Sequence, residues 1–412
     1  MHARSWLLAL AFAGIAHGQT LSLDEALRIA EARSPQLAAQ RAAAEAAGAL
    51  IPAAGENPDP KLFFGVENLP ATGAERWSLS DDFMTMRRVG VMQEFVRGEK
   101  RELRATRAGA EAQRETAIVE MQRAELRKEV ATAWLERHYA ERARELLRSL
   151  EREAALQLEI ATADVGAGKV SPAEAIGARS LRATLLDRGA EAEQKARRAT
   201  AMLGRWLGAD ASRALGAPPD IQAIAHHAGS LTGNLESHPH LAMYAPMEAA
   251  AQAEMRLAAA ATKPDWTVEL SYAQRGSAYT DMVSIMVRVD LPFFASRRQD
   301  PVALSKAKLL EQVRAQAEDA RRRHAAEIEA GLVDWEAARS RLERYRLEIV
   351  PLAEERAGST ASAYEGARAD LGVALEARRN VIEAKVSALN AELEVARAWA
   401  QLAFLLPERK LP

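Results

Sequence analysis

Two kinds of hydrophobic periodicity alternate along the chain. Over two long stretches, 99–165 and 301–366, apolar or small residues recur every three or four positions. That spacing is typical of helices packed along a common seam, as in a coiled coil. At about 1.5 Å per residue the first stretch would be roughly 100 Å long. We expect each stretch to be one long helix, followed by a shorter helix that begins near Ser171 or Asp370.

Between the helices the period changes to two, which predicts four short strands at about 59–68, 86–95, 264–275 and 282–293. Such alternation fits a half-buried sheet in a soluble protein. It fits equally a membrane strand that is apolar toward lipid and polar toward water. Periodicity alone leaves both alternatives open. In the membrane alternative, the lipid-facing residues of the second pair of strands are Trp266, Val268, Leu270, Tyr272, Val283, Ile285, Val287 and Val289.

The membrane alternative carries a requirement of its own. Unpaired backbone N–H and C=O groups in lipid cost several kcal/mol each, so a sheet there has to close on itself. Closed barrels begin at about eight strands. Four strands from one chain are too few, so a barrel would need two or three copies of the chain.

The chain is an internal duplication. Ser34-Pro35-Gln36-Leu37 matches His238-Pro239-His240-Leu241, and 25 residues separate Pro35 from Pro60 as they separate Pro239 from Pro264. The halves are 19–207 and 231–412, and a stretch rich in Gly, Ala and Pro at 208–230 is interpreted as a linker. Residues 1–18 resemble a cleaved signal peptide, with Arg4 ahead of an apolar run and a small-residue cleavage site before Gln19.

Composition excludes several classes of function. The 412 residues include no cysteine, which rules out a disulfide scaffold, a Cys metal site and an acylated N-terminal Cys. A formal net charge of −2 gives no reason to expect a nucleic-acid partner. Motifs of hydrolases, P-loop enzymes, zinc proteases and dinucleotide-binding enzymes are absent from the sequence. We therefore expect neither an enzyme nor a resident cofactor.

The ordered set of these features resembles the TolC family of outer-membrane efflux channels. The most specific pieces are Leu23-Asp24-Glu25-Ala26-Leu27, Tyr364-Glu365-Gly366 and Leu375-Glu376-Ala377. The resemblance implies a mainly α fold with a small transmembrane β part. It implies a homotrimer whose 12-stranded β-barrel, four strands per protomer, lies in outer-membrane lipid and continues into a long periplasmic α-helical barrel. Implied partners are a periplasmic adaptor (membrane fusion) protein and an inner-membrane resistance-nodulation-division pump, for which the channel is a passive exit duct.

The resemblance also implies a periplasmic aperture near the starts of the two shorter helices. Glu174 and Glu376 match acidic positions of the family, and Tyr364 matches a tyrosine of the gate. Val373 stands at another acidic position and Ala369 at the gate arginine, so Asp370 and Arg368 are the nearest substitutes. Acidic side chains repeated around a pore favour cations.

The exported substrate is the least determined part. Asn57-Pro58-Asp59-Pro60 and the segment 66–70 resemble the heavy-metal branch of the family, which suggests copper/silver or zinc/cobalt/cadmium ions. Soft thioethers suit Cu(I) and Ag(I), but packing is the favoured role of Met84, Met86, Met92, Met282 and Met286. We expect solvated loop positions for His226, His227, His238 and His240, and name no metal site. Alternatives are a drug or small-molecule channel of the same family and a soluble periplasmic coiled-coil adaptor.

Overall fold

The computed structural model describes residues 20–224, 231, 233, 235–366 and 368–406. The chain forms two compact units. One is drawn from Met1–Pro35, Arg123–Asn234 and Ala325–Pro412, and the other from Gln36–Gln122 and Leu235–His324. Each unit takes segments from both sequence halves. The two halves of the duplication are therefore intertwined and do not form two consecutive domains.

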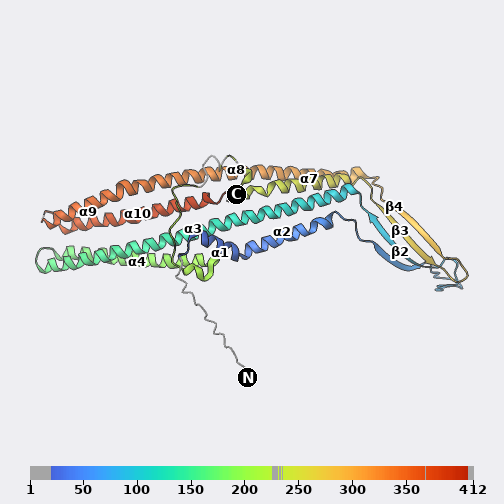
Figure 1. Ribbon diagram of the computed structural model, residues 1–412, viewed down its shortest axis with the longest axis horizontal. Coiled ribbons are helices and arrows are strands. Elements are labelled where there is room, and N and C mark those ends of the chain that lie inside the picture. The colour runs from blue at the N-terminus through green and yellow to red at the C-terminus, as the bar shows by residue number, and fades with distance from the viewer. Residues whose placement is uncertain (1–19, 225–230, 232, 234, 367, 407–412) are drawn as a thin grey trace, which may run out of the picture. The chain divides into compact units, whose positions relative to one another are not determined.

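The first unit consists of helices. It contains α1 (Leu23–Arg33), the later part of α3 (Gly98–Gly166), α4 (Pro172–Leu207), the short η1 (Gly208–Ser212), the end of α8 (Gln299–Arg344), α9 (Val350–Glu365) and α10 (Leu371–Ala403). In Figure 1, α3 with α4 and α9 with α10 form two hairpins. One π-helical turn, Tyr345–Ile349, joins α8 to α9, so the second long helix expected at 301–366 has an irregularity inside it.

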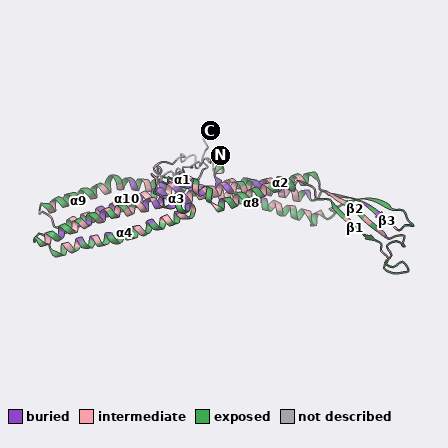
Figure 2. Ribbon diagram, turned by 60° about the horizontal axis from the view of Figure 1, so that its bottom comes forward, coloured by how far each residue is buried: buried purple, intermediate pink, exposed green. Residues whose placement is uncertain are grey.

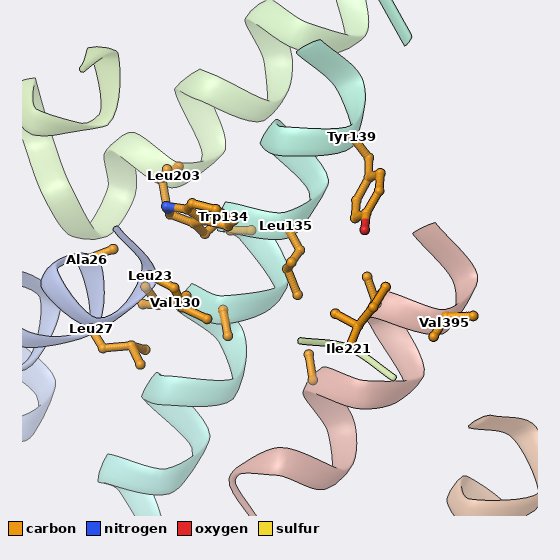
Figure 3. Close-up of a cluster of buried hydrophobic side chains, with 14 of the residues drawn as sticks. Leu23, Ala26, Leu27, Val130, Trp134, Leu135, Tyr139, Leu203, Ile221 and Val395 are labelled. Atoms are coloured by element: carbon orange, nitrogen blue, oxygen red, sulfur yellow. The ribbon is translucent and has the colours of Figure 1, made fainter. Parts of the chain in front are cut away.

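The core of this unit gathers apolar side chains from segments far apart in the sequence (Figure 3). Leu23 and Leu27 of α1 lie near Val130 and Trp134 of α3, and Val395 of α10 belongs to the same cluster. Burying a large apolar side chain stabilises a fold by about 1.5–3 kcal/mol. The cluster therefore holds α1, α3, α4 and α10 together where the hairpins begin.

The duplication reappears in how two tryptophans bind the backbone. The indole N–H of Trp134 donates to the carbonyl of Leu21 at 3.1 Å, and the indole N–H of Trp335 donates to the carbonyl of Ile221 at 3.1 Å. His138 stacks on the first indole and Arg339 lies over the second, each four residues further along the helix. In each half, a tryptophan of the long helix thus holds the segment that precedes the half's first helices.

The region interpreted as a linker is partly packed. Ile221 is buried, and Leu215 pairs with Leu21 in a parallel bridge. The buried guanidinium of Arg137 donates to the carbonyls of Ala211 and Arg213 at 2.5 and 2.8 Å. Residues 208–224 are therefore a packed part of the first unit, in which some of their backbone carbonyls accept from buried donors. Residues 225–230 and the expected signal peptide, 1–18, lie outside the described residues.

The second unit joins helices to one sheet. Its helices are α2 (Pro35–Ala54), α6 (Pro239–Ala242), α7 (Tyr244–Ala260) and the first parts of α3 and α8. Its strands are β1 (Lys61–Glu67), β2 (Met86–Phe95), β3 (Trp266–Gln274) and β4 (Met282–Val289), with the short η2 (Leu235–Ser237) and η3 (Ala295–Arg297) nearby. Among the described residues, no helix is both long enough and apolar enough to cross a bilayer.

Replacing Trp134 with Phe tests the hydrogen bond between the indole and the Leu21 carbonyl. The exchange keeps most of the apolar contact but removes one of two donors to the buried Leu21 carbonyl, which still accepts from the N–H of Gly216 at 3.0 Å. We therefore expect the free energy of unfolding to fall by about 0.5–1.5 kcal/mol. Urea unfolding of the detergent-solubilised protein measures this. The matched control is Trp77→Phe, because Trp77 is exposed. Equal unfolding midpoints for the two variants would show that the hydrogen bond from Trp134 to Leu21 adds nothing to stability.

Candidate functional site

The sheet of the second unit has one apolar face and one polar face. The strand order is β1-β2-β3-β4, with every neighbouring pair antiparallel. Val89 lies opposite Tyr272, and Leu270 lies opposite Ile285, so directly paired residues share a face. The face so defined is almost entirely apolar. Its members are Leu62, Phe64, Val66, Arg87, Val89, Val91, Gln93, Phe95, Trp266, Val268, Leu270, Tyr272, Gln274, Val283, Ile285, Val287 and Val289.

Most residues of this apolar face are exposed in the single chain, and Figure 2 colours exposed residues along the strands. Val283 is 70% exposed and Ile285 is 74% exposed. Of the eight residues expected to face lipid, Val268 is half-buried and the other seven are exposed. A half-buried sheet of a soluble protein covers its apolar face with other elements, and here no element of the same unit does so. A continuous exposed apolar surface of this kind marks an interaction with a membrane or another protein.

The opposite face of the sheet is polar and internally paired. Arg88 of β2 is at its centre and donates to Glu67 at 2.6 Å, to Ser271 at 2.9 Å and to Glu269. Its guanidinium also lies over the ring of Phe63, with 5.2 Å to the ring centroid. Gly90 makes room for this arrangement, because a Cβ there would lie only 2.5 Å from the Phe63 ring.

Two methionines of this polar face, Met92 and Met286, contact an arginine. The guanidinium nitrogens of Arg288 lie 3.9 Å from the sulfur of Met92 and 3.6 Å from that of Met286. Arg288 also pairs with Glu269 at 3.5 Å. A guanidinium beside both sulfurs repels a metal cation, so the contacts agree with a packing role for these methionines. Among the described residues, no group of three or more His, Asp or Glu side chains is arranged to hold a metal ion.

The expectation of solvated histidines is wrong for His238. This side chain is fully buried, and its Nδ1 lies 3.0 Å from Nε2 of His324 on α8. The His240 ring stacks on His324, with 5.5 Å between ring centroids. The duplicated Pro239 starts the short helix α6 directly after His238. The polar sequence around His238 is typical of a loop and gives no sign of this packing. His226 and His227 lie outside the described residues.

At the far ends of the hairpins in the first unit, three of the four expected aperture residues line one hollow of about 1510 Å³: Glu174, Tyr364 and Asp370. Arg368 and Val373 line it as well. Glu376 is exposed and is not among the lining residues. The Tyr364 hydroxyl donates to Asp164 at 3.1 Å, and burial together with this carboxylate raises the pKa of Tyr364. The phenol therefore stays protonated and connects α9 to α3.

Sequence reasoning missed two residues of this hollow and its rim. Asp164 is the partner of Tyr364, and nothing in its local sequence distinguishes it from other helix-surface acids. Ser171 is the N-cap of α4, whose side chain accepts from the N–H of Glu174. The pattern Ser-x-x-Glu ahead of an apolar run is the signature of a capping box. That signal was available in the sequence.

Comparisons with known proteins identify the fold. No family model matches the chain, and no curated protein matches it. Among solved structures, a membrane protein from Pseudomonas aeruginosa has a TM-score of 0.80 at 16% identity, over 93% of this chain and 90% of that one. CusC, whose structures are described in terms of transmembrane channel formation, has a TM-score of 0.76 at 13% identity, over 93% and 92%. The outer-membrane channel CmeC of Campylobacter jejuni has a TM-score of 0.77 at 12% identity, over 94% and 87%.

The chain has the fold of outer-membrane channel proteins. The match extends over 93% of this chain. The mainly helical fold with a small antiparallel sheet, expected from the TolC resemblance, is confirmed. The single chain leaves β1 and β4 as the two outer strands of the described sheet.

Two adjacent residues of β4 provide a test of which face meets lipid. Ile285 lies on the apolar face and Met286 on the polar face, and both are exposed. If the apolar face meets hydrocarbon, Ile285→Arg costs about 2–4 kcal/mol of membrane folding. Met286→Arg is the matched control and should have little effect. Folded protein in lipid vesicles, scored by protease protection, measures both, and equal yields would exclude lipid from the apolar face.

Proposed function

We propose that this chain is a subunit of a passive outer-membrane channel, the exit duct of a tripartite efflux system. The observation that carries the proposal is the four-stranded sheet, with one uncovered apolar face and two outer strands. The fold of outer-membrane channel proteins supports it. In this function the protein performs no chemical step, and an inner-membrane pump acting with a periplasmic adaptor supplies the energy.

The sheet edges favour a homotrimer. The backbone groups on the free sides of β1 and β4 need partners before the sheet can enter hydrocarbon. A second copy offers them, since β4 of one chain can pair with β1 of the next. Three copies make a 12-stranded barrel, with the apolar face toward lipid and the Arg88 face toward water. This arrangement needs no lipid anchor, which agrees with the absence of cysteine.

Heavy-metal cations are the proposed substrate class. The support is the resemblance of Asn57-Pro58-Asp59-Pro60 and neighbouring segments to the metal-exporting branch. Met92 and Met286 add no support, because Arg288 contacts their sulfurs. In the proposed channel Glu376, exposed at the start of α10, contributes negative charge to the aperture.

Assembly and conduction test the channel directly. We expect purified protein to migrate as a heat-resistant trimer in detergent and to conduct in planar bilayers. Glu376→Gln should weaken block of the current by divalent cations, because it removes a carboxylate from each subunit. Arg356→Gln, on α9, is a control for a changed helix-surface charge. A monomer recovered from the soluble periplasmic fraction would contradict the channel and favour the adaptor alternative.

Growth assays test the substrate class separately. A strain lacking the gene should lose tolerance to one or more of copper, silver, zinc, cobalt and cadmium, and a plasmid copy should restore it. Common antibiotics provide the comparison in the same strain. Sensitivity to antibiotics with unchanged metal tolerance would exclude the metal branch while leaving the channel itself intact.

A further inference from the structure

Glu174 uses its two carboxylate oxygens on two different helices. One oxygen, Oε2, accepts from the backbone N–H of Ser171 at 2.9 Å and from the Ser171 hydroxyl at 2.7 Å. The other, Oε1, accepts from the backbone N–H of Leu371 at 3.1 Å. Ser171 caps α4, and Leu371 is the first residue of α10. A single side chain therefore binds the starts of both helices.

The start of α10 has no side-chain cap of its own. Its N-cap residue is Asp370, and the Asp370 side chain makes no capping hydrogen bond. The first N–H groups of a helix have no partner inside the helix and need an acceptor from elsewhere. Glu174 supplies that acceptor from the other hairpin. Its negative charge also interacts favourably with the positive ends of both helix dipoles.

We propose that Glu174 is a shared cap that couples the α3–α4 hairpin end to the α9–α10 hairpin end, and that removing it lets the two ends separate. The proposal rests on the proposed function only for its consequence, which is the width of the aperture. It assigns Glu174 a positioning role in place of a free charge in the pore. At the start of α10, Glu376 is exposed and Asp370 makes no capping hydrogen bond.

A second contact acts in parallel with the cap. The Tyr364 hydroxyl binds Asp164, so α9 and α3 are also connected near the same ends. Losing the cap should therefore widen the gap between the ends without unfolding either hairpin. Farther from these ends the hairpins stay joined, because Leu181 and Leu185 of α4 share a buried cluster with Ile382 of α10.

The absence of cysteine allows a direct distance measurement in the full-length protein. Ile176→Cys and Val373→Cys place spin labels on α4 and α10 at exposed positions beside the cap. Labelled chains are diluted with unlabelled chains in detergent, so that the measured distance is within one chain. We expect Glu174→Ala to lengthen and broaden this distance.

Three further variants separate the cap from charge and from folding. Glu174→Gln retains one acceptor oxygen, which can serve only one helix, so its distance should lie between those of the parent and Glu174→Ala. Ser171→Ala removes the α4 side-chain partner but leaves the bond to Leu371, so its distance should stay near that of the parent. Glu376→Gln removes a nearby charge without touching a cap and should match the parent. A Glu174→Ala distance equal to that of Glu376→Gln overturns the proposal.

Conduction gives the functional readout, and it keeps the two proposals distinguishable. Glu174→Ala should raise the open fraction of the channel several-fold, with Glu376→Gln altering only cation block. If no variant conducts, the parent included, the channel proposal fails while the distance measurement still decides the cap. If all variants conduct with equal open fractions, the channel stands and the link between the cap and the aperture fails.

The cap should persist in mild acid. The hydrogen bonds from Ser171, followed by the backbone N–H groups of α10, lower the pKa of Glu174 below that of a free glutamate. A lowered pKa in the folded state stabilises the structure above the unfolded pKa, and that stability is lost as pH falls through the folded value. The label distance should therefore lengthen on acidification at a pH below that at which a free glutamate titrates.

Discussion

The pairing of backbone polar groups is the constraint on which the architecture depends. In hydrocarbon, each N–H and C=O without a partner costs several kcal/mol, so a sheet with two open edges cannot enter a membrane alone. The chain presents such a sheet, with β1 and β4 outermost. It also presents an apolar face that water does not favour. In the proposed channel, copies that join edge to edge supply the missing backbone partners, and lipid covers the apolar face of the closed sheet.

Much of this arrangement follows from local sequence. Period-two alternation predicts the strands, because a strand with one apolar and one polar face has alternating residue types. The alternation is the same whether the apolar face meets a protein core or lipid. The pairing of Leu270 with Ile285 then followed from antiparallel geometry once the hairpins formed. Which environment covers the face did not follow from periodicity. It is the exposure of Ile285 in the folded chain that argues against the soluble alternative.

Long-range packing was harder to predict. The duplicated contacts of Trp134 and Trp335 join an indole to a carbonyl more than a hundred residues away, and no local pattern encodes such a pair. His238 was misassigned for the same reason, since its partner His324 lies on a distant helix. The compact units also cross the sequence halves. The duplication was visible in the sequence, but the way its two copies intertwine was not.

The charges on the polar face of the sheet bear on which ions a channel would select. The polar face carries three basic side chains, Lys61, Arg88 and Arg288, and three acidic ones, Glu67, Glu94 and Glu269. Its formal charge is therefore balanced, and Arg88 and Arg288 are already paired with carboxylates. A water-filled barrel lined by this face would have little average preference for either sign of ion. In the proposed channel, discrimination between cations and anions thus falls to the hairpin ends. With Glu174 engaged as a cap, the free acidic groups there are those of residues such as Glu376, whose carboxylate no cap requires.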